Sequence, residues 1–474
     1  MRRQIHRWAT VLYVSSLASF GAYGAEVGQD EATAVAQWWL TEELQANWQK
    51  MQPAELANRQ DALAEPTALP LLQDNGNYMA SPGAQGASGY VVTFPEGGYV
   101  IVSGDDRMAP VLAFDLEARF DWDALEGTAG RDLIGRMLSS WDSYLASGKV
   151  DRTGDGTHPR WSDLRESMAP AEALEKAPVE DAYTPRNPDM LIQFTTASWD
   201  QGGFYNDTLQ PHVGGNDSVP VGCTATAMAI LMRYFEWPYT GTGSNNYWDV
   251  CDGTNYYHSV TLGSVYDWSN MPLTSLTSVN DDVADLMYEC AVMAGMDYEV
   301  NASAAWPSAS VMNNNFRYRG TIDRSSDHAD PIITCIKALV PVIVSNPSHT
   351  MVCYGYRDTN DPDFFHINAG TDGFADGWYS LDALPGSHPA IAMSCPYGTP
   401  SNYTYVNVYN TGTENGDLDT PWDTIQEGES NVAYNGQLWI KGATYTGTGN
   451  CPIVLGEGGE RFTVHAYDGD AIIR

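Results

Sequence analysis

The chain has 474 residues, of which 43 % are hydrophobic, and a formal net charge of −36 at pH 7. This length exceeds what one ordinary hydrophobic core serves, and it therefore predicts two to four globular domains. The acidic balance argues against nucleic acid and anionic membrane surfaces as partners, because both would repel the chain. We interpret the charge as a means of staying soluble in an extracellular or saline medium.

The first 25 residues are typical of a secretory signal peptide. A basic start between Arg2 and Arg7 precedes an apolar run at residues 8–20, and small residues follow at 21–25. The apolar run is too short to span a bilayer, and the later sequence predicts no transmembrane segment. We therefore expect residues 1–25 to be removed and the protein to be exported.

Residues 26–147 predict a small α+β domain. The predicted elements are helices at 31–49 and 133–145 and strands at 89–94, 98–102 and 111–114. The first two strands are joined by Pro95-Glu96-Gly97, and two alternating apolar runs around such a turn indicate a hairpin.

Three further regions follow. Residues 148–186 are rich in Gly, Pro and charged residues and predict an exposed linker with one short helix, open to maturation cleavage. Residues 187–400 predict a large domain, with helices from Cys223 and at 283–296 and strands at 341–344, 350–356 and 364–368. Residues 401–474 predict a β-rich tail of short strands.

Pro220-Val221-Gly222-Cys223 places a cysteine at the start of an apolar helix. A helix N-terminus favours the thiolate, which is the nucleophilic form of the thiol. Gly222 leaves room for a substrate carbonyl to approach. The segment therefore indicates a nucleophilic Cys223, and a small buried cysteine at a helix start is the alternative that the segment alone leaves open.

Seven cysteines in an exported chain leave one thiol over. If Cys223 is the free one, the remaining six allow up to three disulfides, whose pairing the sequence leaves open. Their irregular spacing and the lack of any Cys-x-x-Cys pair argue against a zinc site. The Asp-rich residues 358–361 fit a calcium loop or a solvated turn, and we interpret them as a turn. We expect no metal and no cofactor.

Thiol catalysis needs a base near the sulfur and a third group that orients the base. His349 enters a β-like run and is the best-placed base, whereas His366 lies inside an apolar run and is interpreted as structural. Asn368 ends the next run and is expected to pair with the His349 imidazole and fix its tautomer. The backbone N–H of Cys223 and the side chain of Gln201 are candidates for an oxyanion hole.

These residues, in this order, resemble the streptopain family of secreted bacterial cysteine proteases, which share the papain-like fold. The matching segments are a pro-domain-like stretch at 97–112, an opening at 197–206, the nucleophile motif at 219–227, shorter matches at 266–271 and 308–310, a histidine block at 349–356 and an asparagine block at 365–379. The predicted fold class is therefore α+β: a papain-like catalytic domain, preceded by a small α+β pro-domain and followed by a β-rich segment.

The resemblance implies a mechanism for the hydrolysis of peptide bonds in proteins or peptides. Cys223 attacks the carbonyl, and His349 moves the proton as general base and acid. Asn368 orients His349, and the Gln201 side chain with the Cys223 N–H holds the oxyanion. Water then hydrolyses the acyl-enzyme.

The resemblance also implies a secreted or cell-surface bacterial zymogen. Residues 26–147 would cover the active site as an intramolecular inhibitor until the linker at 148–186 is cut. Ala369 departs from the family, which usually carries tryptophan directly after the asparagine, as an aromatic shield against water. We therefore expect a wetter, weaker pair of His349 and Asn368, with reduced activity or a changed pH optimum.

The tail at 401–474 loosely resembles the opening coils of a pectin-lyase-like parallel β-helix, and an ordinary β-rich appendage is the alternative. A degenerate surface or adhesion protein with a glycan-binding tail is therefore a second hypothesis for function. A glycan lyase or hydrolase is a third, weakened because the sequence offers no carboxylate pair that we can place across a cleft.

Overall fold

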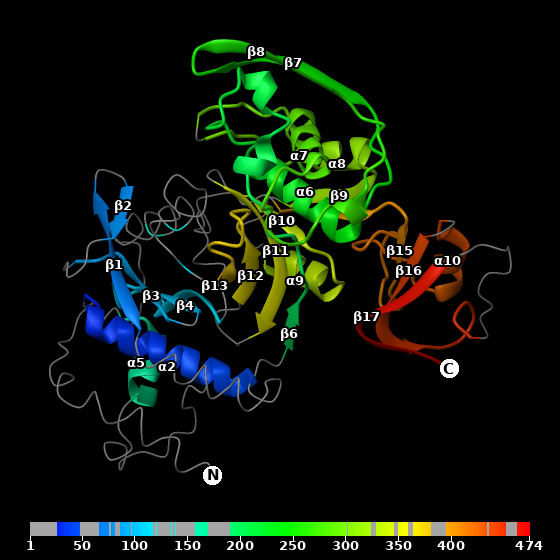
Figure 1. The fold of residues 1–474 in the computed structure, drawn as a ribbon. Helices are drawn as coiled ribbons and strands as arrows, with labels where there is room; N and C mark the ends of the chain where they lie inside the picture. The colour runs from blue at the N-terminus through cyan, green and yellow to red at the C-terminus, as the bar shows by residue number, and fades with distance from the viewer. Residues whose placement is uncertain are drawn as a thin grey trace.

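The fold is taken from a computed structural model of the chain (Figure 1). The structure describes residues 26–47, 66–74, 77–80, 86–95, 97–116, 120, 134, 138, 157–168, 190–300, 302–323, 329–345, 349–358, 364–380, 395–433, 436–451 and 462–474. The predicted signal peptide and most of the helix predicted at 133–145 lie outside these residues. Within the described part of the chain, no helix has both the length and the apolarity to cross a membrane.

Five antiparallel strands form the N-terminal part of a 12-stranded sheet, in the order β2-β1-β3-β4-β5. Their bounds are β1 (Thr67–Asp74), β2 (Asn77–Ala80), β3 (Gly89–Thr93), β4 (Tyr99–Ser103) and β5 (Val111–Asp115). β3 pairs with β4 around a turn in which Gly97 and Gly98 have φ angles of 104° and 91°. The hairpin predicted from this turn is confirmed.

Both faces of this part of the sheet are covered. Helix α2 (Gln29–Asn47) lies along one face, where its Val35 and Trp39 pack with Phe114. On the other face Ile101 packs with Leu138. Because successive side chains of a strand point to opposite faces, covering both faces buries whole strands rather than alternate residues.

Helix α5 (Pro159–Met168) falls within the predicted linker but packs on the N-terminal domain. Trp161 is fully buried, and its indole N–H donates to the Met108 carbonyl at 2.9 Å. Arg165 forms an ion pair with Glu31 at 2.9 Å. The short helix predicted here is present, but it is docked rather than exposed.

The sheet continues without a break into the middle domain, in the order β5-β13-β12-β11-β10-β14-β9, and β6 pairs with β11. The bounds are β6 (Met190–Gln193), β9 (Tyr318–Asp323), β10 (Val342–Ser345), β11 (Thr350–Asp358), β12 (Phe364–Asn368), β13 (Gly377–Ser380) and β14 (Cys395–Pro400). At the junction Phe114 of β5 pairs with Trp378 of β13. Buried His366 contacts the Asp115 carboxylate at 3.2 Å across the same junction, which fits its predicted structural role.

Helices and a hairpin lie beyond this sheet, at the top of Figure 1. They are α6 (Cys223–Phe235), α7 (Asp281–Ala294), α8 (Ala309–Asn315), β7 (Ser244–Cys251) and β8 (Thr254–Thr261). Helix α9 (Ala329–Lys337) instead packs on β10 and β11, in the core that includes Ile336 and Val342. α6 packs against α7 in a second core that includes Met228 and Leu286. α7 begins at the cap Asn280, whose side chain accepts the Val283 N–H, and ends at the left-handed Gly295.

The tail is a separate sheet of three parallel strands, β15 (Tyr403–Val406), β16 (Gly436–Tyr445) and β17 (Phe462–Ile473), with helix α10 (Ile425–Asn431) between the first two in sequence. Trp439 stacks on His465 in the neighbouring strand with ring centroids 4.4 Å apart. The tail packs on the middle domain, where Tyr403 meets Phe235 at 5.7 Å and Arg319 pairs with Asp417 at 2.8 Å.

Candidate active site

Cys223 is the first residue of α6 and is half-buried. Gly222 precedes it with a φ of 93°, in the region that favours glycine. A Cβ at Gly222 would lie 2.6 Å from the end of the Met296 side chain, so a larger residue would be strained by this φ and would have to displace that side chain. The local sequence therefore places the thiol at a helix N-terminus. Backbone N–H groups that have no partner within the helix point toward this end of it.

The pKa of the Cys223 thiol is lowered from 9.0 to about 7. Burial alone raises the pKa, but hydrogen bonding to His349, the charge of His349 and hydrogen bonds from Thr350 outweigh burial. About half of the thiol is then ionised at neutral pH. The structure thus brings together the two residues that the sequence predicted as nucleophile and base.

His349 lies directly before β11 and is 4 % exposed. Its Nε2 lies 2.8 Å from the Ala369 carbonyl oxygen. Because a carbonyl only accepts, Nε2 carries the proton, and Nδ1 is the nitrogen left to exchange a proton with the Cys223 sulfur. The tautomer is therefore set by the Ala369 carbonyl.

Asn368, at the end of β12, acts differently from the prediction. Its Nδ2 donates to the Ala197 carbonyl at 2.8 Å and its Oδ1 accepts the Gly370 N–H at 2.9 Å. Within the described part of the chain, the hydrogen bonds of Asn368 do not include His349. The Gly370 N–H belongs to the same peptide group as the Ala369 carbonyl, so Asn368 reaches the imidazole through that peptide group. The expected direct pair is replaced by this indirect one because the chain turns at Ala369 and presents its carbonyl to the ring.

The pair of His349 and Asn368 is shielded from solvent in this form of the chain. Asn368 is 1 % exposed and Ala369 is fully buried, in a core that includes Ile367 and Ala375. The expectation of a solvent-exposed pair is therefore wrong here, because neighbouring apolar side chains cover the position where the family carries an aromatic one. Whether Ala369 lowers activity stays a prediction.

Gln201 is held next to the nucleophile by its backbone. Its carbonyl accepts the Val221 N–H at 2.9 Å, two residues before Cys223. Its own N–H donates to Asp200 Oδ1 at 2.7 Å. Among the described residues its carboxamide has no hydrogen-bond partner, so the amide is available to a substrate oxygen.

The buried carboxyl group of Asp376, which was not predicted from the sequence, supports the segment around Ala369. Asp376 Oδ1 accepts the Ala369 N–H at 2.9 Å, and burial, with Asp115 and Asp372 nearby, raises its pKa from 3.8 to about 7. The pKa of Asp200 is raised to about 6, first by burial and then by Asp372. No sequence signal separates these acids from the many solvated ones in the chain.

Among the described residues, no disulfide joins any two of the six cysteines whose side chains the structure describes. Cys290 lies against Met232 with the two sulfur atoms 3.7 Å apart, and Cys353 donates to the Gly355 carbonyl at 3.6 Å. The disulfides that the sequence left open are therefore not formed among these cysteines.

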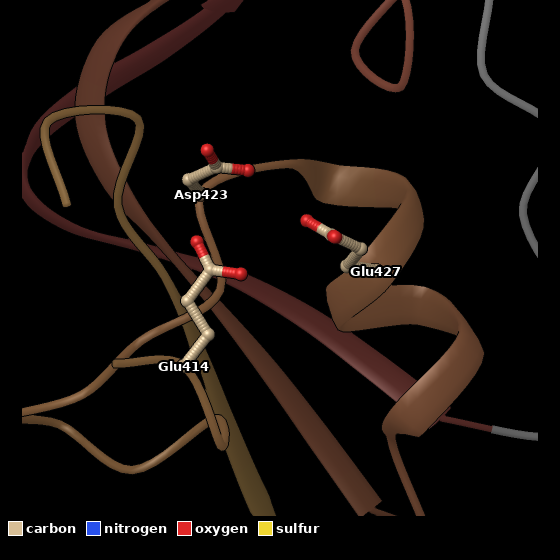
Figure 2. A group of neighbouring side chains, drawn as sticks. All are labelled: Glu414, Asp423 and Glu427. Atoms are coloured by element: carbon tan, nitrogen blue, oxygen red, sulfur yellow. The ribbon is translucent and has the colours of Figure 1, made fainter. Parts of the chain in front are cut away.

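Glu414, Asp423 and Glu427 in the tail bring carboxylate oxygens within 4.8 Å of one another (Figure 2). Burial and mutual repulsion raise the pKa values of Glu414 and Asp423. Glu427 Oε2 accepts the Thr424 hydroxyl at 2.6 Å, a local helix-cap contact. Three half-buried acids alone do not define a metal site. The Asp-rich stretch at 358–361 lies almost wholly outside the described residues.

Two family matches cover the parts of the chain that carry this geometry. Residues 199–379 match the peptidase C10 family, and residues 24–133 match the Spi protease inhibitor family. The first span contains Cys223, His349, Asn368 and Gln201. The matches confirm the predicted resemblance, with a protease domain behind an inhibitor-like pro-domain, and the mixed helices and strands of the structure confirm the α+β fold class.

Curated relatives are about a quarter identical to this chain over the residues that align. The thiol protease/hemagglutinin PrtT of Porphyromonas gingivalis is 28 % identical over 324 residues, which is 64 % of this chain and 35 % of that protein. The chain thus spans about a third of PrtT. Streptopain of Streptococcus pyogenes is 26 % identical over 321 residues, 63 % of this chain and 75 % of that protein.

Solved structures give a weaker match. A prointerpain A fragment of Prevotella intermedia aligns with a TM-score of 0.46 and 20 % identity, over 71 % of this chain and all of that one. Active interpain A of the same organism aligns with a TM-score of 0.36 and 24 % identity, over 45 % of this chain and 96 % of that one.

Proposed function

Residues 199–379 belong to the peptidase C10 family and follow a Spi protease inhibitor region, and on this premise we propose that the chain is the zymogen of an exported cysteine endopeptidase. Its substrates are proteins or peptides. The observation that carries the proposal is the hydrogen-bonded pair of Cys223 and His349 at the N-terminus of α6, with the thiol pKa lowered to about 7.

In the proposed mechanism His349 Nδ1 takes the Cys223 proton, and the thiolate attacks the peptide carbonyl. The carbon–nitrogen bond breaks as His349 returns the proton to the leaving amine. A water molecule, deprotonated by His349, then attacks the thioester, and the acid product leaves with Cys223 restored. The Ala369 carbonyl keeps the proton on Nε2 throughout and stabilises the imidazolium that forms at each step.

The oxyanion needs donors that face it before the reaction begins. We propose the backbone N–H of Cys223 and the carboxamide of Gln201. The bond between the Val221 N–H and the Gln201 carbonyl ties their two loops together and supports this assignment.

Asn368 and Asp376 are proposed as supports of the Ala369 carbonyl. Asn368 Oδ1 accepts from one peptide group of this residue and Asp376 Oδ1 accepts from the other. A hydrogen bond on the N–H of a peptide group polarises its carbonyl and strengthens the bond that the carbonyl accepts. In this way the asparagine orients His349 without touching it.

For the zymogen we keep the proposed division into a signal peptide (1–25), an inhibitory pro-domain (26–147), a linker (148–186), a catalytic domain (187–400) and a tail (401–474). The N-terminal domain meets the catalytic domain near the site, because the Tyr99 hydroxyl donates to the Asp376 carbonyl at 2.9 Å. The pro-domain can therefore act on the segment from Ala369 to Asp376, whose Ala369 carbonyl binds His349, while Cys223 itself stays half-buried.

The docked helix α5 narrows the expected cleavage window. It is held to the N-terminal domain by Trp161, whereas β6 pairs with β11 in the catalytic domain. A cut that separates the two domains therefore falls between α5 and β6, at residues 169–189.

The test follows purified precursor and a Cys223→Ala variant by intact-mass spectrometry under reducing conditions. The proposal expects only the unmodified chain to trim itself at 169–189 and then to digest casein. If neither chain trims, a trace of an unrelated protease is added to cut the window, and casein digestion is measured again.

Casein digestion that persists in Cys223→Ala, or no digestion after the cut, would overturn the proposal. The second outcome would favour the degenerate surface protein with a glycan-binding tail, which a glycan-binding assay on the cut chain then addresses. Release of reducing ends from polysaccharides would favour the glycan hydrolase.

A further inference from the structure

Three buried hydroxyl groups form a row next to the nucleophile. Thr224 follows Cys223 in α6 and is fully buried, Ser345 ends β10 and is 1 % exposed, and Thr350 begins β11 and is 3 % exposed. Ser345 and Thr350 are direct partners in the β10–β11 ladder. The row therefore joins the helix of Cys223 to the two strands that present His349.

The distances make this row a continuous chain of hydrogen bonds. Ser345 Oγ lies 2.8 Å from Thr350 Oγ1, and Thr350 Oγ1 lies 3.0 Å from Thr224 Oγ1. Thr224 Oγ1 donates to the Ala305 carbonyl at 2.6 Å. Thr350 is the middle member, and hydrogen bonds from its N–H and its hydroxyl are among the causes that lower the pKa of the Cys223 thiol.

Each hydroxyl has one proton, so the row has a direction. The Ala305 carbonyl only accepts, and the Thr224 hydroxyl therefore donates its proton to this carbonyl. Thr350 then donates to Thr224, and Ser345 donates to Thr350. With a neutral sulfur, every hydroxyl in the row is satisfied and none points its proton at Cys223.

A thiolate changes this balance. A hydrogen bond to an anion is roughly twice as strong as one between neutral groups. Turning the Thr350 proton from Thr224 to the sulfur therefore gains more than it loses, and Ser345 still donates to Thr350 Oγ1 and holds it in place. Acylation of the sulfur removes the charge and returns the proton to Thr224.

We propose that Thr350 is a further residue of the active site, whose hydroxyl and backbone N–H bind the Cys223 thiolate while Ser345 and Thr224 hold the hydroxyl in position. This rests on the proposed function only in that it takes Cys223 as the reactive thiol. The alternative is that the three hydroxyls merely satisfy one another in the core, in which case the thiol does not depend on them.

The test measures the rate at which iodoacetamide alkylates Cys223 between pH 4 and pH 10, followed by peptide mapping of that cysteine. Alkylation reports the thiolate whether or not the chain cleaves peptides. Failure of the Thr350 proposal is therefore distinguishable from failure of the protease proposal. His349 is the titratable group that acts on Cys223 directly, and it is unchanged in every variant.

Thr350→Val keeps the shape of the side chain and removes the hydroxyl. We expect the pH midpoint of alkylation to rise by about one unit, the size expected when one hydrogen bond to an anion is lost. Thr350→Ser keeps the hydroxyl and should restore the midpoint to within roughly 0.3 units of the original chain. Thr404→Val, at a buried threonine of β15 in the tail, is the matched control and should leave the midpoint unchanged.

Circular dichroism checks that each variant is folded. If Thr350→Val does not fold, Thr350→Ala is smaller, also lacks the hydroxyl, and carries the same expectation. An unchanged midpoint in a folded variant without the hydroxyl would overturn the proposal, and so would an equal rise in Thr350→Ser or in Thr404→Val.

Discussion

Asp376 makes the stability of the zymogen depend on pH in a direction opposite to that of most acids. Its pKa is raised by burial to about 7, against 3.8 for an ordinary aspartate. The folded chain therefore holds a proton between these two values that the unfolded chain has released. The stability that this group contributes is full below about pH 4 and is lost as the pH rises to 7.

The magnitude follows from the size of the shift. One pKa unit is worth about 1.36 kcal/mol, so a shift of roughly three units corresponds to about 4 kcal/mol between low and neutral pH. Asp376→Asn removes the titration, and its carboxamide oxygen still accepts the Ala369 N–H that Asp376 accepts at 2.9 Å. We expect the variant to be more stable than the parent at pH 7 and to gain less on acidification.

The assay is urea unfolding at pH 5, 6 and 7, with both chains carrying Cys223→Ala to prevent self-digestion. The difference in unfolding free energy between the two chains should change by about 1 kcal/mol per pH unit in this range. Asp200→Asn is the matched control. Because the pKa of Asp200 is about 6, the difference between this variant and its parent should change with pH at lower pH than for Asp376→Asn. A difference between Asp376→Asn and its parent that does not vary with pH would refute the reasoning.

Three further predictions concern the site and the pro-domain. Asn368→Ala should lower kcat about tenfold, on the order of one lost hydrogen bond behind the imidazole, with little change in KM, as measured on a peptide substrate. Gly222→Ala should abolish most activity while the chain stays soluble, because a φ of 93° strains any side chain and the methyl group would have to displace the end of the Met296 side chain, 2.6 Å away; active-site titration measures this. Trp161→Ala should loosen the N-terminal domain by about 3–5 kcal/mol and speed the appearance of mature enzyme in a time course of intact masses; a slower time course would contradict the docked helix.

The elements that local sequence determines were predictable. The hairpin around Gly97 and the helix that begins at Cys223 follow from turn residues and apolar spacing, and both are confirmed. The pairing of Cys223 with His349 could be anticipated from the residue types and the family resemblance, although they are far apart in sequence.

The parts of the site that depend on backbone position were not predictable. The residue that meets the His349 imidazole is set by which way the chain turns after β12, and this places the Ala369 carbonyl rather than the Asn368 side chain on the ring. Burial of Asp376 depends on contacts with β4 and β5, hundreds of residues away, which spacing along the chain does not reveal. The docking of Trp161 on the N-terminal domain is long-range in the same way.

The shared sheet has a consequence for what maturation leaves behind. β5 pairs with β13, and Phe114 packs on Phe364 with ring centroids 5.4 Å apart. A cut that lets the N-terminal domain depart makes β13 an outer strand among those described, with unpaired backbone groups and a bare aromatic surface that includes Trp378. Such an edge attracts other strands and promotes aggregation. The pro-domain therefore also protects this edge from other strands. The mature enzyme should remain soluble longest when the detached pro-domain is present in the same solution.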